Sequence, residues 1–235
     1  MHKQIFIMNK IYKSFESIKQ ALPYIISLSE PSKMETYGYS TSAYKCKQGS
    51  ILNKIEGTVC HNCYARKGRY IFVSCQECLD KRLDKIQNEP YWVDAMIYIL
   101  NHKKRKGKPL ELFRWHDSGD LNSMDHLNKI IEIAKKTPNI IHWLPTKELG
   151  LIQEYVKTKQ PIPKNLNIRI SAFNINGEPA KIKNTTTSVV ITKDNLGKTE
   201  GLDCPVYANP LHGKSCGSCT ACYDINIKRI NYVKH

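Results

Sequence analysis

Between residues 74 and 192, short apolar runs alternate with segments whose apolar residues recur at the helical period. The apolar runs predict strands at 110–116, 140–144, 166–173 and 188–192. The periodic segments predict helices at 74–88, 90–104, 123–136 and 148–157. Strands that alternate with helices predict an α/β fold. We therefore expect a partial βα barrel or a mainly parallel sheet flanked by helices, with cysteine-rich loops before and after it.

The sequence also predicts how the chain is divided into segments around this alternation. Residues 1–45 predict an N-terminal arm, in which 29–33 and 37–40 have the composition of loops. Residues 46–200 then form the βα core with the first cysteines, and 201–235 a cysteine-rich C-terminal tail. At 235 residues, the chain is long enough to bury a core without disulfides.

Polar loops follow three of the predicted strands, with the sequences HDSGD, PTKE and SAFN. Because active sites of such folds lie at the carboxyl ends of the strands, we expect these loops to gather at one edge. Asp117 and Asp120 flank a Ser-Gly turn that could approach a ligand, or could make an ordinary Asx-turn. Arg169 and Ser171 point the same way, and a buried Arg169 would need an anionic partner from the protein or a ligand.

Nine cysteines are the strongest chemical signal in the chain. The first group contains three of them, Cys46, Cys60 and Cys63. The last group contains four, Cys204, Cys216, Cys219 and Cys222. A remaining pair, Cys75 and Cys78, could fill the core or supply extra ligands, and we favour the core.

The spacing of the cysteines suggests which metal centre each group binds. Three thiolates at C-x2-C-x2-C spacing, with a fourth followed by proline, favour a [4Fe-4S] cluster over a zinc knuckle. Three thiolates would leave one iron of such a cluster open, and an open metal position is where chemistry occurs. Buried core cysteines are the alternative for the first group. We therefore expect one or two [4Fe-4S] clusters, with zinc as the alternative.

The net charge of the chain and its lack of a targeting segment suggest its compartment and its binding partners. No apolar run approaches a membrane span, and residues 1–15 show no export signal, so we expect a cytoplasmic protein without membrane contact. In a reducing cytoplasm, clustered cysteines favour metal over disulfides. The net charge of +15 suits nucleic acid or another polyanion. The basic run 103–108 predicts a helix C-terminus, with a phosphate-binding patch as the alternative.

Five stretches resemble the phage "gene product 88" family, namely 32–34, 44–46, 57–65, 113–121 and 143–146. The run FRWHDSGDL at 113–121 is the most specific of them, and the similarity extends from about residue 32 to the C-terminus. This resemblance implies a bacteriophage or prophage origin, hence the host cytoplasm. It implies no particular activity.

A broader resemblance is to radical S-adenosylmethionine enzymes, which carry C-x3-C-x2-C before a partial βα barrel. Cys60 and Cys63 match the last two ligands with Tyr64 adjacent, but thirteen residues separate Cys46 from Cys60. This resemblance implies that the first group holds the [4Fe-4S] cluster that binds S-adenosylmethionine, and that the last group holds an auxiliary cluster. The residues that it implies for the cofactor are Ser118, Gly119, Asp120, Arg169, Ser171 and Tyr64.

Two functions follow from these observations. The first is a radical S-adenosylmethionine-like iron–sulfur enzyme that acts on a nucleotide or nucleic acid and draws electrons from a reductant protein of the host. The second is a zinc- or iron–sulfur-stabilised phage protein that binds nucleic acid without catalysis. The βα alternation with polar strand-end loops favours the enzyme.

Overall fold

The computed structural model describes residues 12–209 and 215–234. The first eleven residues of the predicted arm, and residues 210–214 and 235 of the predicted tail, lie outside this description. The expectation about an export signal therefore falls largely outside it. Within the described residues, no helix combines the length and the apolar character needed to cross a bilayer.

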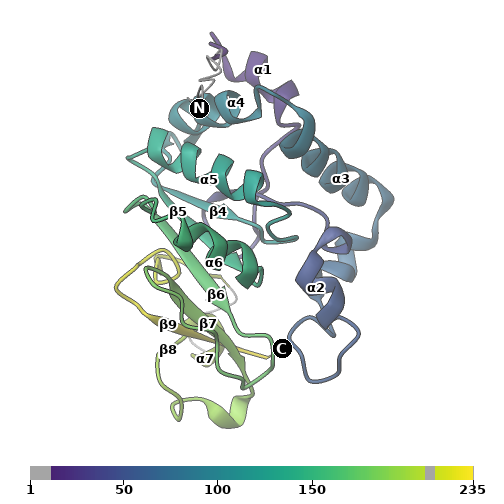
Figure 1. Ribbon diagram of the computed structural model, residues 1–235, viewed down its shortest axis with the longest axis vertical. Helices are drawn as coiled ribbons and strands as arrows, with labels where there is room; N and C mark the ends of the chain where they lie inside the picture. The colour runs from purple at the N-terminus through teal and green to yellow at the C-terminus, as the bar shows by residue number, and fades with distance from the viewer. Residues whose placement is uncertain (1–11, 210–214, 235) are drawn as a thin grey trace, which may run out of the picture.

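A seven-stranded sheet forms the framework of the molecule, and every pair of neighbouring strands in it runs parallel (Figure 1). In spatial order, the strands are β1 (Tyr37–Tyr39), β4 (Leu112–Trp115), β5 (Ile141–Thr146), β6 (Leu166–Ser171), β7 (Thr186–Ile191), β9 (Arg229–Val233) and β8 (Leu202–Asp203). This architecture confirms the predicted α/β fold with a mainly parallel sheet. The sheet runs through all three predicted segments, because β1 comes from the arm and β8 and β9 come from the tail.

Helices cover one face of this sheet (Figure 1). The long ones are α3 (Val73–Asn88), α4 (Trp92–His102), α5 (Met124–Lys136) and α6 (Leu149–Lys157). The side chains of Phe113, Trp115 and Leu144 point from the strands into the main apolar core beneath them, where Trp92 and Leu127 are fully buried. Burial of these large side chains is the main source of stability for the fold.

The two ends of helix α5 are explained by the local sequence. Ser123 adopts extended backbone angles, and its hydroxyl accepts a hydrogen bond from the His126 amide at 3.1 Å. Such an N-cap stabilises a helix by about 1 kcal/mol. Lys135 and Lys136 lie in the last turn, where the helix dipole favours cations. The predicted range 123–136 is confirmed.

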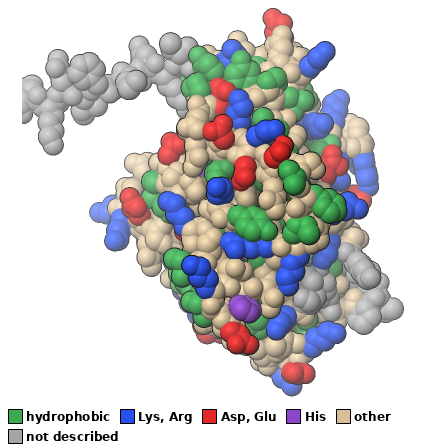
Figure 2. Space-filling model, turned by 90° about the vertical axis from the view of Figure 1, so that its right-hand side faces the viewer, with side chains coloured by type: hydrophobic (Ala, Val, Ile, Leu, Met, Phe, Trp, Pro, Cys, Tyr) green, Lys and Arg blue, Asp and Glu red, His purple; other side chains and the backbone are tan. Residues whose placement is uncertain are grey.

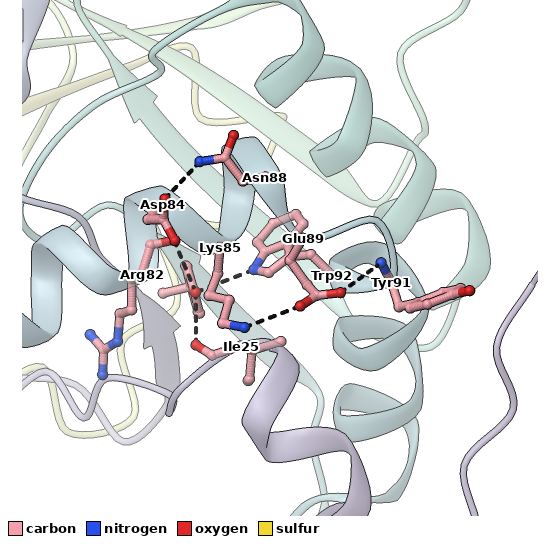
Figure 3. A network of polar contacts seen from close by, with 9 residues as sticks. Ile25, Arg82, Asp84, Lys85, Asn88, Glu89, Tyr91 and Trp92 are labelled. Carbon is pink, nitrogen blue, oxygen red and sulfur yellow. Dashed lines mark hydrogen bonds and ion pairs between the residues drawn. The ribbon is translucent and has the colours of Figure 1, made fainter.

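The N-terminal segment is held to α3 and α4 by a buried tyrosine. The Tyr39 hydroxyl donates to the Ile25 carbonyl at 2.8 Å and accepts from the Trp92 indole at 3.2 Å. Nearby, Lys85 in the last turn of α3 forms an ion pair at 3.1 Å with Glu89, the C-cap residue of the same helix (Figure 3). Residues 37–40 were predicted to be a loop, and this prediction is wrong, because Tyr39 is fully buried and pairs with Trp115 in the sheet.

The basic run 103–108 differs from its prediction as a helix C-terminus. Helix α4 ends at His102, and the run forms an antiparallel hairpin of β2 (Lys104–Arg105) and β3 (Lys108–Pro109). Its two turn residues, Lys106 and Gly107, have φ values of 50° and 79°. Two consecutive residues with positive φ make the tight turn whose twist matches a hairpin.

The other face of the sheet is covered by chain without long helices. Arg114, Trp143 and Tyr232 point to this face, where Trp143 packs against Tyr223 of the C-terminal segment at 5.8 Å between ring centroids. Asn167 fastens the same segment by donating to the Cys222 carbonyl at 3.0 Å. The helical cover is therefore one-sided.

Short elements complete the described chain: α1 (Ile18–Ala21), η1 (Leu22–Tyr24), η2 (Ala43–Lys45), α2 (Lys47–Leu52), η3 (Tyr64–Arg66), η4 (Gly68–Ile71), η5 (Lys193–Asn195) and α7 (Pro205–Ala208). Helix α2 and the turns after it lie between the arm and α3 and carry the first cysteine group. Figure 1 shows α2 and α3 on the same side of the molecule.

Candidate functional site

The three polar loops meet at the carboxyl edge of the sheet, as predicted. Asp120, in the loop after β4, accepts hydrogen bonds from the Thr146 hydroxyl at 2.6 Å and the Lys147 amide at 2.9 Å. It also accepts from the Leu121 amide at 2.8 Å. One carboxylate thereby joins the ends of β4 and β5. Burial raises the pKa of this carboxyl, and the three hydrogen bonds partly offset the rise.

Cys46 is placed at this edge by the start of α2. The buried Glu148, which follows β5, accepts a hydrogen bond from the Gln48 amide in the first turn of α2 at 2.8 Å. Cys46 is the N-cap residue of that helix. A carboxylate at a helix N-terminus is favourable because it meets unpaired amides and the positive end of the dipole. Glu148 therefore holds Cys46 over the end of β5.

Cys60 and Cys63 are placed by the loop that follows β6. Backbone hydrogen bonds join Val59 to Phe173 at 2.8 Å and Ile175 to Gly57 at 3.0 Å. A side-chain amide of Asn53 donates to the Cys60 carbonyl at 2.8 Å. The first cysteine group therefore lies over the carboxyl ends of β5 and β6.

Arg66 fastens the two halves of this cysteine loop together. Its guanidinium donates to the Asn53 side chain at 3.0 Å, the Ser50 hydroxyl at 2.9 Å and the Ala43 carbonyl at 3.1 Å. It also lies 5.0 Å from the ring centroid of Tyr44. Sequence reasoning missed both Arg66 and Glu148, because their partners are distant in the chain and leave no local pattern.

Gly49 lies directly against the thiols. A β-carbon added to it would lie 3.5 Å from the Cys46 sulfur and 3.8 Å from the Cys60 sulfur, and 2.9 Å from the Cys46 β-carbon. The two sulfurs therefore both lie close to this point, where a side chain on residue 49 would clash with the Cys46 β-carbon. Gly49 lies within α2, where glycine lowers helix stability by about 1 kcal/mol relative to alanine. Its presence there is explained by the lack of room for a side chain beside Cys46.

The electrostatics of this group also show that its members are close together. Burial raises the pKa of the Cys46 thiol, and Asp120, Cys63 and Cys60 raise it further. Burial raises the pKa of Cys60 as well, while the cationic Lys147 opposes the rise. Thiols in such surroundings stay protonated unless a cation or metal compensates the charge of the thiolate.

The residues that the radical-enzyme resemblance implies for a cofactor have different surroundings. The Ser118 hydroxyl donates to the Thr41 carbonyl at 2.9 Å, and Gly119 packs directly against Thr41. The Tyr64 hydroxyl donates to the Asp117 carbonyl, so Tyr64 joins the cysteine loop to the end of β4. Ser118 and Gly119 thus serve the turn itself, whereas Asp120 lies beside the thiols.

Ser171 lines a small cavity of about 90 Å³ at the carboxyl edge. Its neighbours in the lining include Lys147, Ser188 and Tyr232. Lys147 lies on the side of Cys60, and the Tyr232 hydroxyl contacts the Cys222 sulfur at 3.2 Å. The cavity therefore lies between the two cysteine groups.

Arg169 is fully buried and does not line this cavity. Its guanidinium donates to the Thr187 carbonyl at 2.8 Å, and to the Ile227 and Asp224 carbonyls at 3.2 and 3.3 Å. The partner that a buried arginine requires is thus a set of backbone oxygens, which fasten the C-terminal segment to the sheet. Arg169 and Ser171 do share a face of β6, as the strand period predicts.

The second cysteine group lies on the face of the sheet opposite the long helices. Cys204 follows β8 and is joined to β9 by its amide, which donates to the Asn231 carbonyl at 2.8 Å. The Cys216 amide donates to the Lys33 carbonyl at 2.6 Å, and the Cys219 amide to the Cys216 carbonyl at 2.9 Å. Burial raises the pKa of Cys204 to about 11, with the other three thiols contributing. The four cysteines are thus neighbours in space.

The described side chains do not form a closed metal-binding site. Among residues 12–209 and 215–234, no three His, Cys, Asp or Glu side chains are arranged as ligands of a single ion. All nine cysteines are free thiols, and each is partly buried. What the described chain provides is proximity of thiols at two places.

Cys75 and Cys78 belong to neither group. Both lie on α3, and the Cys78 sulfur is 3.9 Å from the Ser27 hydroxyl of the N-terminal segment. This contact agrees with a packing role for Cys78.

Comparison with protein families gives one match. A family model described as "Gene product 88" matches residues 10–226. Comparison with curated proteins and with solved structures gives no match. No match to S-adenosylmethionine enzymes accompanies the family match, so that assignment is a proposal.

Proposed function

This chain belongs to the gene product 88 family, and we propose that it is an iron–sulfur enzyme with its open cluster at the carboxyl edge of the sheet. Cys46, Cys60 and Cys63 would hold this cluster. The observation that carries the proposal is the juxtaposition of the Cys46 and Cys60 sulfurs, which both lie within 4 Å of the point where a β-carbon of residue 49 would stand. Glycine at this position lets α2 approach Cys46 closely, although it weakens the helix.

The surrounding residues fit such a group. Cationic Lys147 and Arg66 lie near Cys60 and would offset the negative charge of thiolate ligands. Asp120 joins the ends of β4 and β5 by accepting three hydrogen bonds, and Glu148 joins the end of β5 to the helix that begins after Cys46 by accepting one from Gln48. The site is therefore built on strand ends rather than on free loops, and rigid support of this kind suits catalysis.

The finer proposal is that S-adenosylmethionine is the cofactor. A three-thiolate [4Fe-4S] cluster has one iron free to bind it, and together they would supply reductive radical chemistry. Within the described chain, Asp120, Lys147 and Ser171 are the polar groups placed to orient such a ligand. Ser118 and Gly119 would act indirectly, because they hold the turn that positions Asp120.

The last four cysteines would hold a second cluster with all of its positions filled. Their segment covers Trp143 and Asn167 on the sheet face opposite the long helices. Because metal-binding energy is also folding energy, this cluster would stabilise the C-terminal segment against the sheet.

Metal analysis tests the proposal directly. Protein purified without oxygen should be brown and contain iron and acid-labile sulfide above one cluster per chain. Cys60→Ser should remove one cluster, whereas Cys75→Ser, at a thiol outside both groups, should leave the iron content unchanged. Colourless protein with stoichiometric zinc would exclude the iron–sulfur enzyme.

Spectroscopy separates the finer proposal from the coarser one. S-adenosylmethionine added to the reduced protein should change the electron paramagnetic resonance signal of the first cluster and be slowly cleaved. Cys219→Ser should leave this response in place and lower thermal stability. Full iron loading without any response would mean that both clusters are structural or carry electrons only.

A second candidate is a zinc-stabilised protein that binds nucleic acid without catalysis. The net charge of +15 and the four cysteines that fasten the tail favour it. It leaves the three thiols at the carboxyl edge without a role. Zinc in place of iron, with salt-dependent nucleic-acid binding, would select this candidate.

A further inference from the structure

An open hollow of about 730 Å³ lies beside the first cysteine group, on its outer side. Its lining residues are Asn62, Tyr64, Lys67, Gly68, Arg69, Tyr70 and Lys234. Six of these follow or flank Cys63 in the chain, and the seventh follows the last strand of the sheet. The volume is in the range of ligand sites.

The charge of this hollow is positive throughout. Lys67, Arg69 and Lys234 line it, and no acidic residue does. Some other cations of the described surface do have acidic partners, as in the pairs Lys129–Asp125 and Arg229–Glu178, both at 2.8 Å. Within the described residues, Arg69 and Lys234 form no such ion pair. Figure 2 shows Lys and Arg side chains spread among hydrophobic ones on the side of the molecule where α2 and α3 lie.

The aromatic side of the hollow is held in a fixed arrangement. Tyr64 and Tyr70 lie edge to face, with 6.1 Å between ring centroids. Both hydroxyls are bound to the same residue, because Tyr64 donates to the Asp117 carbonyl and Tyr70 donates to the Asp117 carboxylate at 2.9 Å. Tyr64 is nevertheless 55% exposed. Its phenol is therefore oriented from behind while its ring stays available.

We propose that this hollow binds a nucleotide, with its phosphate on Arg69 and Lys234 and its base on the ring of Tyr64. Cations and exposed aromatic rings are the two components of sites for single-stranded nucleic acid. The aromatic ring favours a nucleotide over an acidic peptide, because carboxylates need only the cations. The hollow adjoins Cys63, so its use as the substrate site rests on the proposed function, whereas binding itself does not.

Fluorescence anisotropy with a labelled eight-nucleotide single strand at low salt tests the proposal. Arg69→Gln with Lys234→Gln should weaken binding at least tenfold, and lower the slope of log affinity against log salt by about 1.4 for two lost phosphate contacts. Tyr64→Leu should weaken binding about tenfold, the loss expected for one stacked base. Lys157→Gln, which removes one positive charge at the end of α6, should change affinity less than twofold.

Competition identifies the ligand. Mononucleotides that displace the strand would indicate a free nucleotide, whereas displacement by oligonucleotides alone would indicate a nucleic-acid strand. Unchanged affinity in the Arg69/Lys234 and Tyr64 variants, or equal displacement by polyglutamate, would overturn the proposal. Iron content measured on the same samples keeps the two proposals apart. Binding without iron would exclude only the enzyme, and iron without binding would exclude only the nucleotide site.

Discussion

The guanidinium carbon of Arg114 lies 4.7 Å from the ring centroid of Trp143, on the sheet face opposite the long helices. This arginine lies between the two cysteine groups. Its charge acts on Cys216 and Cys222 on one side, and it interacts with Tyr64 and Asp117 on the other. Its Nε is buried without a hydrogen-bond partner within the described chain. The Arg114–Trp143 pair thus joins the first cysteine loop to the C-terminal segment.

Replacing Arg114 with methionine should lower the free energy of unfolding by about 2 kcal/mol, because a desolvated cation–π contact is lost. Urea unfolding measures this change. Arg105→Met is the matched control, because the guanidinium carbon of Arg105, in the surface hairpin, lies 5.0 Å from the ring centroid of Tyr37. This substitution should lower the free energy of unfolding by less than about 1 kcal/mol. Equal losses in the two variants would contradict a special role for Arg114.

Gly49→Ala should reduce iron content by at least half, because the new β-carbon would clash with the Cys46 β-carbon at 2.9 Å and displace its thiol. Gly150→Ala is its control. Gly150 also lies within a helix, and a β-carbon there would meet no atom within 4 Å. This control should stabilise the protein by up to about 1 kcal/mol and leave iron unchanged. Full iron loading of the Gly49 variant would contradict a ligand role for the Cys46 thiol in this position.

Asp120→Ala should destabilise the protein by about 2–4 kcal/mol, because it leaves buried donors of Leu121, Thr146 and Lys147 without an acceptor. Chemical denaturation gives this value. The exposed Asp125, paired with Lys129, provides a control whose loss should cost less than about 1 kcal/mol. A variant that lost only cofactor affinity, at unchanged stability, would show that Asp120 acts on a ligand alone.

Two buried histidines should make stability depend on pH. Burial lowers the pKa of His126 and of His142 to about 3. Between about pH 3 and the ordinary value near 6.5, the unfolded chain binds protons that the folded chain does not. Their contribution is therefore complete above about pH 6.5 and falls with decreasing pH by about 1.4 kcal/mol per unit for each histidine.

Urea unfolding at pH 7.5 and 5.5, with iron content checked at both, measures this dependence. The two histidines contribute part of the change in unfolding free energy with pH, and His142→Gln should remove about half of that part. The stability of the variant itself will also fall, because His142 accepts from the Trp115 indole at 3.3 Å and contacts the Thr137 hydroxyl at 2.8 Å. The pH slope is therefore the informative quantity. Equal slopes in the two proteins would contradict a neutral, buried His142.

Much of the fold follows from local sequence. The Ser123 cap and the apolar period after it predict α5 to within one residue. Opposite orientations of His142 and Trp143 follow from the strand period, and the structure confirms them, with His142 against Trp115 and Trp143 against Tyr223. Strand β1 was missed because its glycine and small size resemble a loop. Its strand character comes from Trp115 and Phe113 beside it in the sheet.

Cysteine spacing and polar strand-end loops are local patterns, so the sequence alone identifies the candidate site residues. Their placement depends on the tertiary structure. Glu148 reaches the first turn of α2 from one hundred positions away in the chain, and Gly49 meets sulfurs on both sides of a loop. Arg169, which spacing alone left free for a ligand, is used by the carbonyls of Thr187, Asp224 and Ile227. Such contacts depend on packing between distant segments, where burial and hydrogen-bond satisfaction outweigh local preference.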